Sequence, residues 1–276
     1  MNCPAVAEWL KHQDQRAAHH TREIALDQQK DWLFDGSQIR HRLSRFFSVA
    51  GFEYRNGRSC CAQPLILQPE IGCLGWVTRS TPTGLEFLLQ AKYEPGNCNG
   101  TQIAPTVQAT KSNQDRVHGG AKVPFLHLFQ PGGPTPVVDG LQTEESDRFF
   151  RKLNRNVAVE IRGPLPHPEH FRWCGLSTLQ RLLALSHTVN TDARSALVCM
   201  DWRIFQHPSP ADPVLTAALR RSLDLDLNPS AVHQCLAAAR AGFGQVRQIS
   251  LSELPGWRLT PFGLDSPDAA FAVRYF

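Results

Sequence analysis

Three titratable side chains lie in one polar stretch of the sequence, and their types suit proton transfer. The stretch is residues 90–120 (QAKYEPGNCNGTQIAPTVQATKSNQDRVHGG), and it contains Lys92, Glu94 and His118. Histidine has an unperturbed pKa of about 6.5, which suits either donation or removal of a proton. A glutamate can act as a base when burial raises its pKa, and a lysine ammonium can stabilise a developing negative charge. These three residues are therefore the predicted catalytic groups.

Amides and hydroxyls surround the three titratable groups. Such side chains both donate and accept hydrogen bonds, as the hydroxyls of a sugar require, and a guanidinium matches phosphate oxygens. Gly119 and Gly120 permit close approach of the backbone to a ligand. The stretch therefore predicts a site for a polar, anionic, polyhydroxylated molecule. Its candidate ligand-binding residues are Asn97, Asn99, Gln102, Gln108, Thr110, Ser112, Asn113 and Arg116.

Each catalytic assignment has an alternative that the sequence leaves open. A polar segment is usually a solvated surface loop, although structureless loops longer than about 12 to 15 residues are uncommon in compact domains unless they are functional or disordered. Lys92 and Glu94 alternate on one face of a strand, so they could form a surface ion pair. His118 could anchor the loop through a hydrogen bond.

The elements that must hold this stretch are predicted first as strands. Four runs between residues 45 and 96 are rich in Val, Ile, Phe and Trp, and Asn-Gly, Pro-Glu and Pro-Thr-Gly turn signals separate them. This pattern is typical of an antiparallel sheet. Two further strands are expected at residues 124–129 (PFLHLF) and 156–161 (NVAVEI).

Helices are predicted on either side of these strands. Residues 5–28 have helical composition, and residues 143–155 open with a possible N-cap threonine, with acids in the first turn and bases in the last. Ser177 can cap a further helix that carries inward-facing leucines. The order of sheet, helix, strand and helix predicts the α+β class.

Composition limits the kind of protein. The chain has 276 residues, 42% hydrophobic and 20% charged, which favours a soluble globular protein with one large domain or two. No run approaches the roughly 18 apolar residues that a membrane span needs, and the N-terminal segment lacks an apolar core. We therefore expect a cytoplasmic protein that does not contact the membrane.

Cysteine spacing and net charge exclude two further classes of site. The eight cysteines show no CxxC spacing, so we expect free thiols and no zinc site. The net charge is +4, and the basic residues are spread along the chain without a dense block. This distribution does not support a nucleic-acid partner, but it suits a small anionic ligand.

Five segments follow one another in order, with few gaps, between about Trp32 and Trp257. They are QPLILQPEIGCLGW, FLLQAKYEPGNCNGTQIAPTVQATKSNQDRVHGG, LQTEESDRFFRKLNRN, FRWCGLSTLQRLL and VNTDARSALVCM. Together they strongly resemble the NDP-hexose 2,3-dehydratase family of deoxysugar biosynthesis. The resemblance implies a Nudix-like domain, with a mixed or antiparallel sheet flanked by helices, that is duplicated in each subunit of a homodimer.

The resemblance also implies a reaction. The substrate is dTDP-4-keto-6-deoxyglucose, whose C2 hydroxyl is removed to leave a 3,4-diketo-2,6-dideoxy sugar. A separate, NADPH-dependent 3-ketoreductase then reduces this product, so the dehydratase itself needs no redox cofactor. The acidic metal-binding box of Nudix hydrolases is not preserved in LQTEESDRFFRKLNRN, so no metal is expected.

Residues outside the polar stretch complete the predicted binding site. Lys152, Arg155 and Asn156 could bind the diphosphate, or the bases could form a solvated helix end. Trp173 could stack on thymine, but a tryptophan flanked by Phe171 and another apolar residue is more often part of the core.

A repeated spacing indicates how the chain is divided. Trp32 and Phe46 are fourteen residues apart, as are Trp257 and Phe271. We therefore expect an N-terminal helical lead-in at residues 1–30 and one Nudix-like dehydratase repeat at residues 31–205. A helical connector at residues 206–255 and the start of a second repeat at residues 256–276 are expected to follow. Since members of the family carry two full repeats, the chain could be a truncated or split gene product, or a single-repeat relative in which a second subunit supplies what the missing repeat would. The alternative function is then a catalytically silent module for dTDP-sugar binding or dimerisation.

Overall fold

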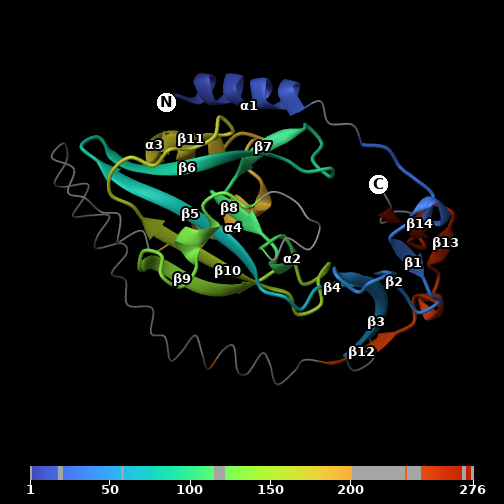
Figure 1. The fold of residues 1–276 in the computed structure, drawn as a ribbon. Helices are drawn as coiled ribbons and strands as arrows, with labels where there is room; N and C mark the ends of the chain where they lie inside the picture. Colours follow the sequence, from blue (N-terminus) through green and yellow to red (C-terminus); the bar gives the residue numbers. More distant parts are fainter. Residues whose placement is uncertain are drawn as a thin grey trace.

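The computed structural model describes residues 2–17, 21–56, 59–114, 122–200, 234, 244–268 and 272–274. Strands dominate the described chain, and a few helices cover them (Figure 1). The predicted α+β class is confirmed.

A mixed sheet of seven strands forms the centre of the molecule. Its main path runs β11, β6, β5, β10, β9, with β7 paired to β6 and β8 paired to β5. Strands β5 and β10 are parallel, and every other pair in this sheet is antiparallel. The strands are β5 Gly72–Thr81, β6 Gly84–Tyr93, β7 Thr101–Ala104, β8 Val107–Ala109, β9 Pro136–Thr143, β10 Leu153–Glu160 and β11 Phe171–Gly175.

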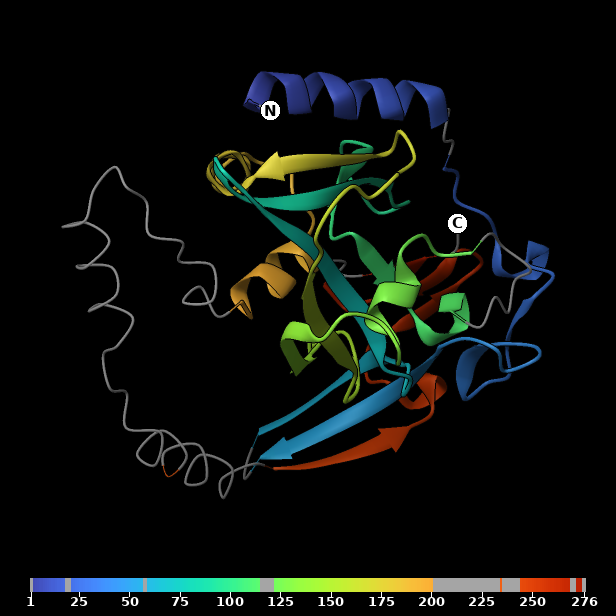
Figure 2. The ribbon, with the colours of Figure 1, turned by 60° about the vertical axis from the view of Figure 1, so that its left-hand side comes forward.

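Three helices pack against one face of this sheet. Helix α1 (Cys3–Ala17) lies over β6 and β7, and Figures 1 and 2 both show it spanning that end of the molecule. Helices α3 (Leu176–Leu183) and α4 (Thr191–Val198) bury leucines and alanines in the same core as Trp76 and Phe87. The packing of α4 against this face therefore sets the position of its first turn relative to the strands.

The other face of the central sheet is covered by a short 3-10 helix, η2 (Leu126–Phe129). Phe129 packs directly over Gly75, where a Cβ atom would lie 2.6 Å from the ring. Burial of such aromatic rings stabilises the fold by roughly 2 to 3 kcal/mol each. The glycine is what allows the ring to lie against the strand.

Two smaller sheets lie beside the central one. The first has the order β1, β2, β3, β12, with β4 paired to β3, and the second has the order β13, β14, β15. A shared apolar cluster that includes Ile39, Ile249 and Leu264 joins them. The remaining elements are β1 Trp32–Phe34, β2 Gln38–His41, β3 Ser48–Asn56, β4 Ser59–Leu67, β12 Gln245–Ile249, β13 Arg258–Thr260, β14 Gly263–Asp265, β15 Ala272–Arg274, η1 Leu26–Gln28, η3 Leu251–Glu253 and α2 Lys111–Gln114.

The described part of the polar stretch, residues 90–114, is more ordered than its composition predicts. It contains the end of β6, the strands β7 and β8, and the short helix α2. Thr106 shows how a polar residue can be buried there, because its hydroxyl accepts a hydrogen bond from the Val77 backbone N–H (2.9 Å) and donates one to the Leu88 carbonyl (2.5 Å). A buried polar group is tolerated when it is hydrogen-bonded in this way.

Two predicted elements are wrong. Residues 143–155 do not form a helix, since β9 ends at Thr143 and β10 begins at Leu153. The residues after Leu153 pair with strands on both sides, and this tertiary pairing overrides the local helical charge pattern. Residues 124–129 form η2 in place of a strand, after Phe125 in a left-handed conformation (φ 60°). The strand predicted at 156–161 is confirmed as part of β10.

Other predicted boundaries differ. The N-terminal α-helix ends at Ala17 and not at residue 28, and Gly175, not Ser177, is the N-cap of α3. The helices expected in the connector 206–255 lie outside the described residues, apart from residue 234, and the end of the connector forms β12 and η3. Within the described part of the chain, each helix is too short or too polar to cross a membrane.

Candidate active site

A cavity of about 290 Å³ lies where the central sheet meets the start of α4. Strands β5, β6, β8 and β10 and helix α2 contribute to its wall. Its lining residues are Gln68, Gly72, Leu74, Lys92, Glu94, Gln108, Ala109, Thr110, Asn113, Glu144, Phe149, Lys152, Asn154 and Asp192.

Six of the residues predicted from sequence line this cavity. They come from β6, from β8 and the residues after it, and from the residue before β10, and they are Lys92, Glu94, Gln108, Thr110, Asn113 and Lys152. Their meeting in one cavity is a consequence of the pairing of β5 with both β8 and β10. Their roles remain predictions.

Glu94 is held by three hydrogen-bond donors. Lys92 Nζ lies 3.3 Å and Gln108 Nε2 2.8 Å from its Oε1 atom, and Asn190 Nδ2 lies 3.2 Å from its Oε2 atom. The alternative of an ion pair between Lys92 and Glu94 is therefore observed, but the pair is only partly exposed and forms part of the cavity wall. Donors on both oxygens suit an ionised carboxylate.

Asn190 connects this carboxylate to α4. It is the N-cap of the helix, since its side chain accepts a hydrogen bond from the Ala193 backbone N–H (2.9 Å). Its amide nitrogen donates to Glu94 and to Gln108 Oε1 (2.9 Å). One buried side chain therefore fixes both the start of α4 and the position of Glu94.

Asp192 lies in the first turn of α4 and faces the cavity. Its pKa is raised to about 6, mainly by burial and then by the carboxylates of Glu144 and Glu94, against the opposing effect of Lys92. A carboxyl group whose pKa lies in this range can exchange protons near neutral pH. Asp192 is therefore the strongest candidate for proton transfer among the residues that the sequence analysis did not select.

A second lysine lies deep in the cavity wall. Lys152 is 3% exposed, and its ammonium group donates to the Glu70 carbonyl. Burial lowers its pKa, and the nearby carboxylates of Glu70, Glu144 and Asp192 partly offset this effect. The cavity therefore combines two cationic groups with three acidic ones in its lining.

Asn154 positions the Glu144 carboxylate from the opposite wall. Its amide nitrogen donates to Glu144 Oε2. Gly72, which pairs with Asn154 across β5 and β10, leaves room for this side chain, because a Cβ atom at Gly72 would lie 2.5 Å from Asn154 Oδ1. This arrangement keeps a carboxylate on the side of the cavity that faces away from β6.

Other predicted binding residues fasten the neighbouring loop. The amide of Asn97 donates to the Gly100 carbonyl (2.9 Å), and Gln102 donates to Asn99 Oδ1 (2.8 Å). Ser112 is buried, and its hydroxyl lies 2.9 Å from that of Thr110. These residues stabilise the wall of the cavity without lining it.

Three more of the predicted residues that the structure describes do not line the cavity. Arg155 forms an ion pair with Asp139 (2.7 Å), and Asn156 is almost completely buried, with no hydrogen-bond partner for its Oδ1 atom among the described residues. Two further predicted residues, Arg116 and His118, lie outside the described residues. The third described residue, Trp173, lies on β11.

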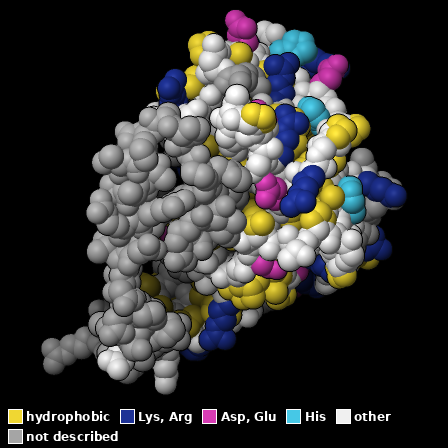
Figure 3. Space-filling model, turned by 90° about the vertical axis from the view of Figure 1, so that its left-hand side faces the viewer, with side chains coloured by type: hydrophobic (Ala, Val, Ile, Leu, Met, Phe, Trp, Pro, Cys, Tyr) yellow, Lys and Arg dark blue, Asp and Glu magenta, His cyan; other side chains and the backbone are white. Residues whose placement is uncertain are grey.

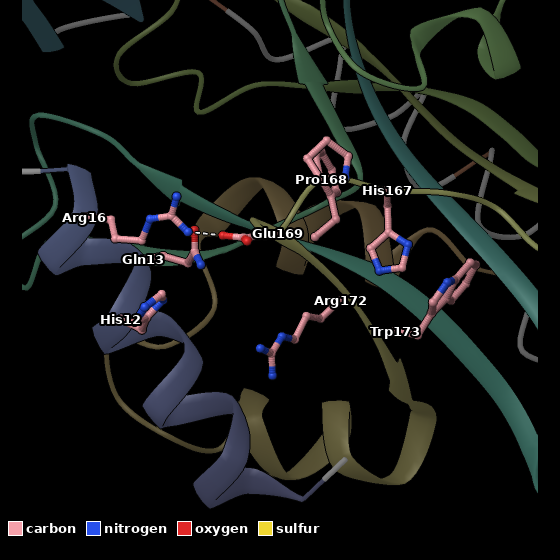
Figure 4. Close-up of a pocket in the computed structure, with 9 residues that line it drawn as sticks. His12, Gln13, Arg16, His167, Pro168, Glu169, Arg172 and Trp173 are labelled. Carbon is pink, nitrogen blue, oxygen red and sulfur yellow. Dashed lines mark hydrogen bonds and ion pairs between the residues drawn. The ribbon is translucent and has the colours of Figure 1, made fainter.

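Trp173 borders a different and larger hollow, of about 790 Å³, at the free edge of the central sheet. Figure 4 shows His12 and Arg16 from α1 and Arg172 and Trp173 from β11 around this open space. The guanidinium of Arg79 lies 4.1 Å from the Trp173 ring centroid, so one face of that ring is already occupied. Glu169 forms an ion pair with Arg16 there.

Sequence reasoning missed four groups that form or support the cavity: Glu144, Asn154, Asn190 and Asp192. A local signal existed for the last two, because Asn-Thr-Asp combines an N-cap residue with an acid in the first turn, which is typical of a helix start. Nothing local indicates that this helix start faces a cavity. Among the described residues, no group of three or more His, Cys, Asp or Glu side chains is arranged to hold a metal ion.

Three curated proteins are similar to this chain over most of its length. A curated relative from Amycolatopsis orientalis is 32% identical over 100% of this chain, and one from Streptomyces violaceoruber is 36% identical over 88% of it. A third, from Saccharopolyspora spinosa, is 32% identical over 95% of the chain. All three bear the name dTDP-4-dehydro-6-deoxy-alpha-D-glucopyranose 2,3-dehydratase, and the matches cover 57%, 55% and 57% of their lengths. The chain thus spans little more than half of these relatives.

A structural comparison adds one solved neighbour. The crystal structure of an ADP compounds hydrolase, 13% identical, covers 65% of this chain and 94% of its own with a TM-score of 0.39. A similarity at this level adds nothing to the assignment of function. The family model described as NDP-hexose 2,3-dehydratase, in contrast, matches residues 4–200. That match confirms the resemblance seen in the sequence, and the chain belongs to the NDP-hexose 2,3-dehydratase family.

Proposed function

We propose that the protein removes the C2 hydroxyl of dTDP-4-keto-6-deoxyglucose to give a 3,4-diketo-2,6-dideoxy sugar nucleotide. The observation that supports this function most directly is the cavity that gathers Lys92, Glu94, Lys152 and Asp192 in a member of this family. The names of the related dehydratases support the same substrate.

The chemistry requires groups of the kinds that line the cavity. The C4 carbonyl makes the C3 proton acidic, a base removes that proton, and negative charge builds on the C4 oxygen. Glu94 supplies the base, and Lys92 stabilises the charge on the C4 oxygen. No electrons leave the sugar, so the elimination requires no redox cofactor.

The size of the cavity suits one part of the substrate. Ligand pockets usually measure about 300 to 1,000 Å³, so a cavity of about 290 Å³ accommodates a sugar ring better than a whole sugar nucleotide. The diphosphate and thymidine then extend beyond the cavity. Lys152 is the predicted diphosphate-binding residue that lies in the cavity wall.

The wider setting of the reaction follows from the family. The protein acts in the cytoplasm as a homodimer, and an NADPH-dependent 3-ketoreductase consumes the diketo product. Residues 31–205 form the dehydratase repeat, and residues 256–276 begin a second one. A second repeat would explain why the relatives are longer than this chain.

A coupled assay tests the proposed function. The protein is incubated with dTDP-4-keto-6-deoxyglucose, a 3-ketoreductase and NADPH, and the reduced dideoxy sugar nucleotide is identified by mass spectrometry. We expect product only when the protein and the reductase are both present. Absence of the product at high protein concentration, with a related dehydratase active under the same conditions, would contradict the proposal.

A further inference from the structure

Elimination needs an acid as well as a base, because hydroxide is a poor leaving group. Asp192 and Glu94 line the same cavity, but they differ in their hydrogen-bond partners. In other enzymes, two carboxyl groups in different environments take the separate roles of general acid and general base.

Glu94 accepts hydrogen bonds from three side chains. Three donors, from Lys92, Gln108 and Asn190, reach its two oxygen atoms at 2.8 to 3.3 Å. Each such bond stabilises a carboxylate more than it stabilises a neutral carboxyl group.

The surroundings of Asp192 favour its neutral form. It makes no hydrogen bond or ion pair with the described residues, and it lies mostly buried at the start of α4. The charged groups that act on it come from every neighbouring element and are Lys92 and Glu94 of β6, Glu144 and Glu145 after β9, and Lys152 before β10. The nearby carboxylates and burial outweigh the lysines, and together they raise the pKa of the Asp192 carboxyl.

We propose that Asp192 is the general acid that delivers a proton to the departing C2 hydroxyl, while Glu94 removes the proton from C3. This inference rests on the proposed function. Both groups line one cavity, and Asn190 links the helix that carries Asp192 to the Glu94 carboxylate. Asn190 is a positioning residue, because it acts through these two groups.

The step balances without any other reactant. The C3–H bond breaks, its proton passes to Glu94, and its electron pair forms the C2=C3 double bond. The C2–O bond breaks as Asp192 protonates the leaving oxygen, so one water molecule departs and the enol at C3 tautomerises to the ketone. Asp192 is left ionised and Glu94 protonated, and exchange with solvent restores both.

Two reactions of the Asp192→Asn variant separate the acid from the base. In deuterated water, exchange of the C3 proton reports the base alone, and formation of the diketo product reports both groups. We expect the variant to lose about 100-fold or more in product formation and to exchange the C3 proton within about threefold of the unmodified rate. The retained exchange also shows that the variant is folded.

A substrate analogue with fluorine in place of the C2 hydroxyl provides the second test. Fluoride leaves without full protonation, so the analogue needs the acid less than the natural substrate does. We expect Asp192→Asn to eliminate fluoride within about tenfold of the unmodified protein, whereas Glu94→Gln loses both fluoride elimination and exchange by about 100-fold or more. The matched control is Asp31→Asn, which removes an exposed carboxyl before β1 and should change neither reaction.

The outcomes distinguish this inference from the proposed function. An unmodified protein that neither exchanges the C3 proton nor forms product contradicts the proposed function itself. An active unmodified protein overturns the role of Asp192 in either of two cases: Asp192→Asn forms product at the normal rate, or it loses exchange in parallel with product formation. In the second case Asp192 belongs to the proton-removal step.

Discussion

The cavity at the start of α4 and the hollow at the edge of β11 contain similar kinds of side chain but differ in how these are enclosed. The hollow is the larger, at about 790 Å³ against about 290 Å³. Its ion pair, Arg16 with Glu169, has side chains that are 56% and 72% exposed, so water screens both charges. The cavity encloses Lys152 and Asp192, and burial shifts the pKa of each. Enclosure, more than size, is therefore what indicates a site for proton transfer.

The two regions also differ in what their charged groups contact. In the hollow, Arg172 lies 5.7 Å from the Trp9 ring centroid and Arg79 stacks on Trp173, so the cations cover aromatic rings. In the cavity, Lys92 and Asn190 both bind the Glu94 carboxylate. The second arrangement places two carboxyl groups of different surroundings and two lysines around one cavity.

Glu94→Gln is the largest expected difference between the two regions. We expect a loss of about 100-fold to 10,000-fold in turnover, because the base is removed while the volume is kept. The matched substitution in the hollow, Glu169→Gln, should leave turnover within about twofold. Turnover in the coupled assay and far-ultraviolet circular dichroism check both variants. Equal losses in the two would remove the functional distinction between cavity and hollow.

Asp192→Asn should change the dependence of stability on pH. The folded protein holds this proton up to about pH 6, whereas the unfolded chain releases it near the ordinary value for aspartic acid, about 3.9. Between roughly pH 4 and pH 6 the folded state therefore binds more protons, and stability falls as pH rises.

At pH 7 we accordingly expect Asp192→Asn to raise the free energy of unfolding by about 1 to 3 kcal/mol. Urea denaturation of the variant and of the unmodified protein, at four pH values between 4 and 7, measures the difference. Asp31→Asn again serves as the exposed control. A difference that does not grow with pH would show that Asp192 titrates as an ordinary surface carboxyl.

Asn190→Ala should lower both stability and turnover. The substitution removes the N-cap of α4, one of the three donors to Glu94 and the donor to Gln108 Oε1, which together cost about 2 kcal/mol in the free energy of unfolding. Because Asn190 only positions the reacting groups, we expect turnover to fall by about 10-fold, less than in Glu94→Gln. Asn190→Ser retains a capping oxygen but loses the amide donor, so it should recover much of the stability without recovering turnover.

Arg16→Gln in the hollow should have the smallest effect. Its ion pair with Glu169 is exposed, and such pairs contribute roughly 0 to 1 kcal/mol. We expect a change in the free energy of unfolding below about 0.5 kcal/mol and no change in turnover. A large loss of turnover would instead make the hollow part of the substrate site.

Local pattern was sufficient to predict much of the central sheet. The segments that form β5 and β6 are rich in apolar residues and end at clear turn signals. The sequence alone therefore predicts that they are strands. The prediction failed where tertiary pairing decided the outcome. Glu144 and Lys152 have the charge order of a helix, yet the chain between them turns and enters β10, which pairs with two neighbours.

The candidate site was predictable only where its residues are near one another in sequence. Lys92, Glu94 and Gln108 fall in one polar stretch, and the structure places all three around the cavity. Asp192 comes from a segment almost one hundred residues later, and its altered pKa arises from burial that no local pattern encodes. The same limit applies to Thr106, whose burial depends on backbone partners in β5 and β6.

The hydrogen bonds of Asn190 have a consequence for the order of folding. They join positions separated by 96 residues, to Glu94, and by 82 residues, to Gln108. The loss of chain entropy opposes such distant contacts until the intervening strands have paired. We therefore expect the base at the end of β6 to reach its place during refolding before the acid on α4, so that the recovery of activity reports the docking of one short helix.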